Sequence, residues 1–201
     1  MNVQKLLTKP ILIIVGKSAS GKDTIFRLLM ERFSYLKTVV MYSTRPIRDN
    51  EVEGREYFFV SRDYRREMEA KGKVIECRTY HTIAGPWDYF TVDDGLIDLE
   101  NHDYLMTGTL VSYQKMKEYY GEDVMIPLYI DLDDGLRLER ALGRERQQQI
   151  PKYKEMCRRF LADAEDFSEE NLEAAGITKR YINEDLQECL EEISSVIRSF
   201  C

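Results

Sequence analysis

Short apolar runs alternate along this chain with stretches in which apolar residues recur at helical spacing. The first run, PILIIV at residues 10–15, is rich in β-branched residues and ends at a glycine, which is typical of a strand buried on both faces of a parallel sheet. Similar runs predict strands at residues 104–108 (YLMTG) and 124–132 (VMIPLYIDL), and a shorter one at residues 38–41. Strands separated by helical stretches predict an α/β fold with a parallel core sheet.

Two stretches have the apolar spacing of amphipathic helices. Directly after the first strand and its loop, apolar residues fall on one helical face, so we expect a helix to begin within that loop. These residues are Ile25, Leu28, Leu29 and Phe33. A second apolar stripe extends over about four turns near the end of the chain. It consists of Leu186, Leu190, Ile193, Ile197 and Phe200.

Two segments between the predicted core strands have a different character. Residues 43–92 are rich in tyrosine and arginine and contain strand-like runs such as EYFFV, whereas residues 138–159 are strongly charged. A chain of 201 residues has the length of one domain. We therefore expect a single domain with a mixed α/β insertion at about 43–92 and a helical lid at about 138–159. Its core would consist of residues 1–42, 93–137 and 160–201.

Composition and charge narrow the classes of function. The net charge of −7 argues against general binding to nucleic acids or anionic membranes, so an anionic partner must be held by a local basic cluster. The apolar run at residues 11–15 is too short for a signal sequence or a membrane span, and we expect a cytoplasmic protein. The four cysteines are scattered without a CxxC pair, which favours reduced structural thiols over disulfides or a zinc site.

The strongest chemical signal is the segment GKSASGKDT at residues 16–24. The Gly-x4-Gly-Lys pattern alone is weak, since about one chain of this length in twenty contains it by chance. Here it follows a predicted buried strand and opens a predicted helix, which is the context of a phosphate-binding loop. Backbone N–H groups and the helix N-terminus attract phosphate, and Lys22 adds a point charge. The alternative is a glycine-rich turn with a solvated lysine.

Asp23 stands where such loops usually carry a hydroxyl that binds Mg²⁺. A carboxylate also binds Mg²⁺, which prefers oxygen ligands, but it repels phosphate when the metal is absent. Thr24 offers a hydroxyl one residue later. We therefore expect Asp23 and Thr24 to hold Mg²⁺, with a ligation that differs in detail.

A second candidate anion site lies in STRPIRDNEVEGREYFF at residues 43–59. Arg45 and Arg48 flank Pro46, which stiffens the backbone and limits the entropy lost on ordering. Two guanidinium groups together with the phenol of Tyr57 suit a phosphate dianion. The alternative is a solvated loop with unrelated arginines.

These motifs in combination resemble the guanylate kinase family, a group of P-loop nucleoside monophosphate kinases. The phosphate loop is followed by STRPIR, then by Glu51, Gly54 and Tyr57, and then by VSRDYRREMEAKGKVIE. RALGR resembles the lid motif of the family, RRFLADAEDF resembles the helix that returns from the lid, and YINEDL resembles the segment beside the adenine. The resemblance extends from about residue 11 to residue 200.

The resemblance implies a three-layer P-loop fold and Mg²⁺-assisted transfer of the ATP γ-phosphoryl group to a nucleoside monophosphate, with GMP as the expected acceptor. The partners would be these small-molecule nucleotides. ATP would be bound by Gly16, Lys17, Ser18, Ala19, Ser20, Gly21, Lys22, Asp23, Thr24, Arg140 and Asn183. GMP would be bound by Arg45, Arg48, Tyr57 and Glu76. The groups implied to act in catalysis are Lys22, Arg45, Arg144 and Arg159.

The chain departs from the family pattern around the acceptor base. Met41 occupies the position of a hydroxyl-bearing residue that helps to read the base. The Tyr-Gly-Ser/Thr motif of the family becomes AGP at residues 84–86, and its Ile-Leu-Asp-Ile-Asp strand becomes YLMTG, without either carboxylate. Glu76 would read the guanine edge, although an ion pair with Arg78 is the alternative for this residue. The resemblance therefore supports phosphoryl transfer more strongly than guanine specificity.

Two other groups could take over the missing roles. Asp131 and Asp133, at the end of a predicted strand, could replace a lost carboxylate, although surface aspartates are a more common explanation. Trp87, Tyr89 and Phe90 could stack on a base, although such clusters more often form the core of a subdomain.

Other functions fit the sequence less well. A kinase for another ribo- or deoxyribonucleoside monophosphate would keep the same chemistry. A non-catalytic guanylate kinase-like module that binds proteins is expected to lack a working phosphate loop, so Lys22 and the lid arginines count against it. A regulatory GTPase is disfavoured because no Asn-Lys pair occurs in the chain. Phosphoryl transfer needs no general base, since a phosphate dianion is already a nucleophile, and the two histidines lie in no motif.

Overall fold

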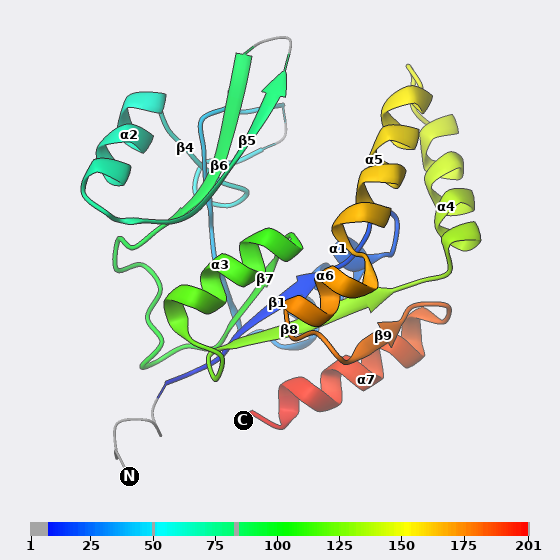
Figure 1. Ribbon diagram of the computed structural model, residues 1–201. Helices are drawn as coiled ribbons and strands as arrows, with labels where there is room; N and C mark the ends of the chain where they lie inside the picture. Colours follow the sequence, from blue (N-terminus) through cyan, green and yellow to red (C-terminus); the bar gives the residue numbers. More distant parts are fainter. Residues whose placement is uncertain (1–7, 50, 83–84, 201) are drawn as a thin grey trace.

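The computed structural model of the protein describes residues 8–49, 51–82 and 85–200. A five-stranded parallel sheet forms the centre of the fold, with the strand order β2-β7-β1-β8-β9 (Figure 1). Its strands are β1 (Ile11–Val15), β2 (Lys37–Thr38), β7 (Tyr104–Thr107), β8 (Met125–Asp131) and β9 (Arg180–Ile182). All residues of β1 are buried because the strand is paired on both sides and covered on both faces, as its unbroken apolar run predicts.

Helices cover both faces of this sheet, so the core has three layers. Helices α1 (Lys22–Arg32) and α7 (Leu186–Arg198) pack on one face. Helices α3 (Leu110–Tyr120) and α6 (Glu169–Ala174) pack on the other. The parallel order brings the loops that follow β1 and β8 to the same edge of the sheet, where ligands bind in open α/β sheets.

A second, four-stranded sheet is built by the segment between β2 and β7. Its strand order is β4-β3-β6-β5, and α2 covers one face. These elements are β3 (Tyr42–Ser43), β4 (Phe58–Phe59), α2 (Arg62–Ala70), β5 (Val74–Thr82) and β6 (Gly85–Val92). We call this part of the chain the second-sheet subdomain.

The two faces of the second sheet differ in chemistry. An apolar cluster that includes the fully buried Phe90 lies under α2. The register pairs Arg78 with Tyr89 and Glu76 with Thr91 across β5 and β6. Because side chains alternate along a strand, these four share the face that α2 leaves open.

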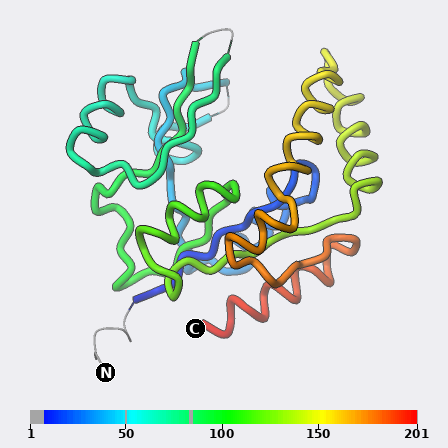
Figure 2. The backbone as a smooth tube through the Cα atoms, viewed as in Figure 1, coloured from blue at the N-terminus to red at the C-terminus, as the bar shows by residue number. Residues whose placement is uncertain are grey.

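Helices α4 (Asp134–Arg146) and α5 (Tyr153–Asp166) form a helical pair that projects from the core. Figures 1 and 2 show this pair at one side of the molecule and α2 with its sheet at the other, while the core sheet lies below both. The second-sheet subdomain and the α4–α5 pair therefore stand on either side of the sheet edge that carries the phosphate loop.

Most of the elements expected from the sequence are confirmed. The strands expected at residues 10–15, 104–108 and 124–132 are present within one residue at each end, and a helix begins directly at Lys22. The strand expected at residues 38–41 is mostly wrong. β2 ends at Thr38, and the chain then crosses from the core sheet to the second sheet, so residues 39–41 form no strand.

The final helix is confirmed, but its apolar stripe is shorter than expected. The helix ends at Arg198, and Leu190, Ile193 and Ile197 are buried against the core. Phe200 lies beyond the helix end and is 38% exposed, so it does not extend the stripe.

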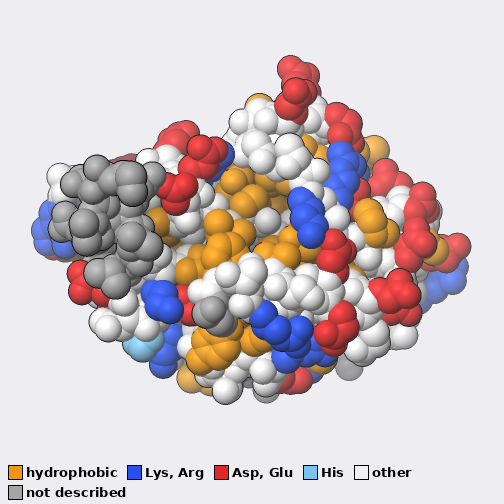
Figure 3. All heavy atoms as spheres, turned by 90° about the horizontal axis from the view of Figure 1, so that it is seen from below, with side chains coloured by type: hydrophobic (Ala, Val, Ile, Leu, Met, Phe, Trp, Pro, Cys, Tyr) orange, Lys and Arg blue, Asp and Glu red, His pale blue; other side chains and the backbone are white. Residues whose placement is uncertain are grey.

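Two expectations from composition can be compared with the structure. On the face shown in Figure 3, Lys and Arg side chains are interspersed with Asp and Glu. Cys77, Cys157 and Cys189 are free thiols, and Cys201 lies outside the described residues. Within the described ranges, no helix is both long and apolar enough to cross a membrane.

Candidate active site

The loop between β1 and α1 depends on two glycines. Gly21 has a φ of 94°, and a Cβ there would come within 2.2 Å of the side-chain nitrogen of Asn183. A Cβ at Gly16 would come within 2.6 Å of the carbonyl oxygen of Ile130 in β8. No side chain caps the start of α1, which leaves N–H groups of the first helical turn for an anion. The two glycines therefore allow the loop to pack closely against Ile130 and Asn183. The start of α1 keeps backbone N–H groups that could bind an anion.

A cavity of about 280 Å³ lies beside this loop. Residues from the loop and α1, from α4, and from the segment between β9 and α7 line it. They are Ala19, Gly21, Thr24, Arg140, Arg144, Asn183 and Leu186. All but Leu186 are residues for which the sequence predicts a role in binding ATP or in phosphoryl transfer. The fold therefore brings candidates from three distant segments to one cavity.

Asn183 joins the loop to its neighbours. Its buried Nδ2 donates to the carbonyl oxygen of Ser20 at 2.7 Å, and Arg140 donates from Nη2 to the backbone carbonyl of Asn183 at 3.0 Å. The Oδ1 of Asn183 is buried and accepts no hydrogen bond from the described residues. Buried acceptors are normally satisfied, so this oxygen is an unsatisfied acceptor beside the cavity.

The residues at the start of α1 combine a cation with oxygen donors. The Nζ of Lys22 lies 3.9 Å from the carboxylate of Asp23, whose side chain is 79% exposed. Mg²⁺ is commonly held by one or two carboxylates together with substrate phosphates and water. The carboxylate of Asp23 and the hydroxyl of Thr24 fit such an ion. Within the described residues, no three acidic, histidine or cysteine side chains form a metal site on their own.

The three arginines expected in the lid occupy different environments. Arg140 and Arg144 lie on α4 and line the cavity. Arg159 lies on α5, where its side chain is 63% exposed and donates from Nε to Glu155 at 3.0 Å. The structure thus brings two of the three to the cavity, whereas Arg159 pairs with Glu155 on α5 and does not line the cavity.

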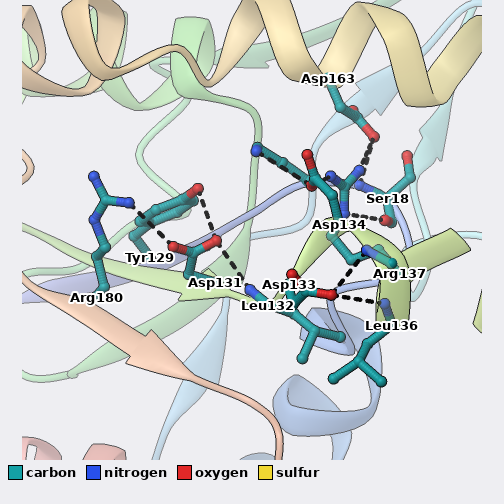
Figure 4. Close-up of polar contacts among 12 residues, drawn as sticks. Ser18, Tyr129, Asp131, Leu132, Asp133, Asp134, Leu136, Arg137, Asp163 and Arg180 are labelled. Carbon is teal, nitrogen blue, oxygen red and sulfur yellow. Dashed lines mark hydrogen bonds and ion pairs between the residues drawn. The ribbon is translucent and has the colours of Figure 1, made fainter.

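A buried ionic network, which the sequence analysis does not foresee, joins the loop to α4 and α5 (Figure 4). Arg137 of α4 is fully buried and donates from Nε to the carbonyl oxygen of Ser18 at 3.1 Å. Its Nη2 donates to the carboxylate of Asp163 at 3.3 Å, and its Nη1 pairs with Asp134. The ring of Phe160 lies 4.7 Å from the guanidinium carbon.

The same network also holds the N–H group of the loop. Ser18 donates from its backbone nitrogen to the carboxylate of Asp163 at 2.7 Å. Arg137 and Asp163 therefore fix the peptide groups on both sides of Ser18. The only local signal for this arrangement is the spacing of three residues between Asp134 and Arg137, which is common on exposed helices.

Asp131 and Asp133 are committed to partners within the protein (Figure 4). Asp131 pairs with Arg180 at 3.2 Å. Asp133 caps α4, since its carboxylate accepts hydrogen bonds from the backbone nitrogens of Gly135 and Leu136. These contacts favour a structural role for both carboxylates over the replacement of a lost active-site carboxylate.

Arg45 is held in place by Glu51 in the second-sheet subdomain. Its buried guanidinium donates two hydrogen bonds to the Glu51 carboxylate, at 2.7 and 2.5 Å, and lies over the rings of Tyr57 and Phe59. This guanidinium lowers the pKa of Glu51 to about 2. The Nε of Arg45 is buried without an acceptor among the described residues, so one donor of this guanidinium is left unsatisfied.

Arg48 and Tyr57 lie next to this pair. The backbone nitrogen of Arg48 donates to Glu51 at 2.8 Å, and its side chain is exposed. The ring of Tyr57 packs edge-on against Tyr89, with centroids 5.4 Å apart. Burial raises the pKa of Tyr57, so its hydroxyl remains a neutral donor. Glu51 and Arg45 thus connect the three candidates for the acceptor phosphate.

Glu76 is paired within the protein. Its Oε2 accepts from the Nε of Arg78 at 3.1 Å, and its Oε1 accepts from the hydroxyl of Thr91 at 3.0 Å. Its side chain is only 1% exposed. The Nη2 of Arg78 also contacts the sulfur of Met41 at 3.4 Å. The carboxylate is therefore not presented to a ligand in this state.

The three aromatic candidates near the end of the β5–β6 hairpin separate by face. Phe90 belongs to the apolar core under α2, so it cannot stack on a base. Tyr89 lies on the opposite face against Tyr57, and Trp87 is half-buried. Ala84, one of the departures from the family pattern, lies outside the described residues.

Comparisons with known proteins agree with this geometry. The sequence profile described as guanylate kinase matches residues 8–84. A guanylate kinase of Symbiobacterium thermophilum is 26% identical over 193 residues, covering 93% of this chain and 83% of that protein. A guanylate kinase of Nostoc sp. is 40% identical over 70 residues, which cover 35% of each chain.

Solved structures lead to the same fold. The crystal structure of guanylate kinase from Anaplasma phagocytophilum superimposes with a TM-score of 0.63 at 22% identity, covering 96% of this chain and 86% of that one. The matches to guanylate kinases extend over nearly the whole chain, and the profile match includes both the phosphate loop and the STRPIR segment, so this chain is similar to guanylate kinases in sequence and in fold.

Proposed function

We propose that the protein transfers the γ-phosphoryl group of ATP to a nucleoside monophosphate, with GMP as the expected acceptor and ADP and GDP as products. The observation that carries this proposal is the cavity in which the phosphate loop, Arg140 and Arg144 of α4, and Asn183 meet. Such a cavity offers backbone N–H groups and cations to a polyphosphate and an amide to its base. The similarity of the chain to guanylate kinases supports the choice of GMP.

The parts of the fold would divide this work. The core would bind ATP at the phosphate loop, and the second-sheet subdomain, residues 43–92, would bind the acceptor. Residues 138–159 would form a lid that carries Arg140 and Arg144 over the phosphates. The position of the loop at the sheet edge between these two parts supports this division.

Catalysis would depend on position and charge. Phosphoryl transfer passes through a loose transition state, with charge spread over the transferring oxygens. Lys22 and Arg144 would stabilise that charge, while Arg45 would hold the acceptor phosphate in line. The attacking oxygen belongs to a phosphate dianion, so no side chain needs to remove a proton.

Mg²⁺ is proposed as the cofactor that enters with ATP. It would be held by Asp23 and Thr24 together with phosphate oxygens, and it would supply charge neutralisation between the phosphates. Without Mg²⁺ the carboxylate of Asp23 would repel the phosphates. Its exposed side chain on the first turn of α1 therefore fits a site that binds ATP together with Mg²⁺.

The main alternative is the same reaction with another acceptor. It is favoured by one observation, namely that the carboxylate of Glu76 is covered by Arg78 and Thr91.

A coupled assay of ADP release with ATP and each common NMP and dNMP separates a guanine-specific kinase from a kinase for another acceptor. We expect the highest kcat/KM with GMP or dGMP. A different preferred acceptor would support the alternative, and no acceptor-dependent ADP release would overturn phosphoryl transfer.

A further inference from the structure

The open face of the second sheet presents Arg78 rather than Glu76. The side chain of Glu76 is 1% exposed, whereas that of Arg78 is 16% exposed. Both carboxylate oxygens of Glu76 already accept hydrogen bonds from Arg78 or Thr91. An incoming base would therefore meet the guanidinium before the carboxylate.

The guanidinium of Arg78 is held by Glu76, and its Nη groups make only weak contacts with other described residues. Its Nε donates to Glu76 at 3.1 Å, and this contact fixes the plane of the group. Its Nη2 donates to Oε1 of Glu76 at 3.5 Å and contacts the thioether of Met41 at 3.4 Å; the first is at the distance limit of a hydrogen bond and the second is to a weak acceptor, so a stronger acceptor would replace them. Within the described ranges, Nη1 makes no hydrogen bond to another residue, and it is not a buried unsatisfied atom.

The same face also carries groups proposed to hold the acceptor phosphate. Arg78 is paired in register with Tyr89, whose ring packs against Tyr57. The ring of Tyr57 in turn lies 5.2 Å from the guanidinium carbon of Arg45. A nucleotide whose phosphate is bound by Arg45 can thus direct its base along this face toward Arg78.

We propose that Arg78 determines the specificity for the acceptor base by donating to O6 and N7 of guanine, while Glu76 positions its guanidinium. This inference rests on the proposed function, since it concerns the acceptor site of the same reaction. The bidentate contact of arginine with O6 and N7 is the commonest specific contact by which proteins read guanine in the major groove of DNA, and the same two acceptors are present on a free guanine nucleotide. Adenine has an amino group in place of O6, so the same fork would face a donor.

This way of reading the base differs from direct recognition by Glu76. A carboxylate would accept hydrogen bonds from N1–H and the N2 amino group, on the opposite edge of the base. IMP lacks the N2 amino group but keeps O6 and N7. The 5′-monophosphate of 7-deazaguanosine keeps the amino group but lacks N7. These two analogues therefore separate recognition by Arg78 from recognition by Glu76.

The test compares kcat/KM for GMP, IMP, 7-deaza-GMP and AMP in the unaltered protein. We expect kcat/KM for IMP to be within about threefold of that for GMP, since no contact to the guanidinium is lost. We expect kcat/KM for 7-deaza-GMP to be lower than that for GMP by about 10- to 150-fold, which corresponds to one lost hydrogen bond to a charged group. We expect kcat/KM for AMP to be lower than that for GMP by at least about fivefold.

A double variant then tests whether Glu76 and Arg78 cause the difference in kcat/KM between GMP and 7-deaza-GMP. E76Q/R78M removes both charges together, so no unpaired charge is left buried. It is expected to accept GMP and 7-deaza-GMP within about threefold of each other. The control D63N/R66M removes an exposed ion pair on α2, on the other face of the sheet, and should keep the difference between GMP and 7-deaza-GMP.

Two results would overturn the role of Arg78 and leave the proposed kinase reaction intact. The first is a kcat/KM for IMP that is far below that for GMP, together with a kcat/KM for 7-deaza-GMP that is equal to that for GMP. The second is a higher kcat/KM for pyrimidine nucleotides than for GMP. If no nucleoside monophosphate supports ADP release, the proposed function itself fails, and the inference fails with it.

Discussion

Replacing Arg137 by methionine should destabilise the protein and weaken ATP binding. Arg137 is fully buried, and its guanidinium donates to the carbonyl oxygen of Ser18 and to the carboxylates of Asp134 and Asp163. Methionine fills a similar volume beside Phe160 but offers no donor. The change would leave the carbonyl oxygen of Ser18 without this donor and Asp163 without its cation.

The magnitude follows from how far the charges left behind are buried. Removing one partner of a buried ion pair typically costs about 3–5 kcal/mol. The side chains of Asp163 and Asp134 keep exposures of 16% and 52%, so we expect the lower end of that range, about 3 kcal/mol. For a chain of this length each kcal/mol lowers Tm by about 2–4 °C, so we expect a decrease of about 6–12 °C. D163A should cost less, about 1.5–3 kcal/mol for a hydrogen bond to a charged group, because Arg137 keeps Asp134.

A double-mutant cycle tests whether the network acts as a unit. The free energy of unfolding is measured by urea denaturation for R137M, D163A and R137M/D163A, and the double variant should lose about 0.5–3 kcal/mol less than the sum. R180M is the matched control, since it removes an arginine that is 36% exposed and pairs with Asp131 and the exposed Glu169, and it should cost about 1 kcal/mol or less. R137M should also raise the apparent KM for ATP, because Ser18 belongs to the phosphate loop. Additive losses, or a cost for R137M no larger than for R180M, would refute this reasoning.

Three further predictions concern the charged groups of the site. Lys22→Met should lower kcat by at least about a hundredfold, the effect of losing one preorganised electrostatic group, while Lys71→Met, an exposed change on the surface, should not. Near-normal activity of a variant with an unchanged thermal melt would contradict the role of Lys22. Arg48→Ala should raise the apparent KM for the monophosphate by about 10- to 150-fold and affect that for ATP much less, as measured by steady-state kinetics; equal effects on both substrates would show that this arginine is wrongly placed. Because Arg45 lowers the pKa of Glu51 to about 2, the ionised carboxylate stabilises the folded state above its unfolded pKa of about 4.3, and this contribution disappears as the pH falls through about 2. The stability difference between the wild type and Glu51→Gln, measured by urea denaturation, should therefore be constant above about pH 5 and shrink toward pH 2; a difference independent of pH would argue against the pair.

The parts of the fold that depend on local pattern could be predicted from the sequence. The apolar run of β1 and the glycines of the following loop are adjacent in the chain. A short sequence window therefore contains the whole strand–loop–helix unit. The strand at residues 38–41 was predicted wrongly because Val39 and Val40 have strand propensity wherever they lie. Their conformation is decided instead by the crossing between two sheets, which a local pattern does not contain.

The site could be predicted in part for the same reason. Glu76 and Arg78 are two residues apart on one strand, so their pairing is visible in the sequence as an alternative to base recognition. The contact of Arg78 with Met41 depends on how β3 and β5 are placed around β6, and no local pattern indicates it. The partnership of Arg137 with Asp163 likewise depends on the packing of α4 against α5 over the loop.

The central claim is that the cavity beside the phosphate loop and the arginines of the second-sheet subdomain serve a single phosphoryl transfer. Its most direct test is the initial rate of ADP formation from ATP, measured with and without GMP, dGMP, AMP, CMP and UMP. We predict that ADP forms in proportion to a guanine nucleotide acceptor, with equal amounts of the corresponding diphosphate. ADP formation that does not depend on any acceptor, or none at all, would contradict the account.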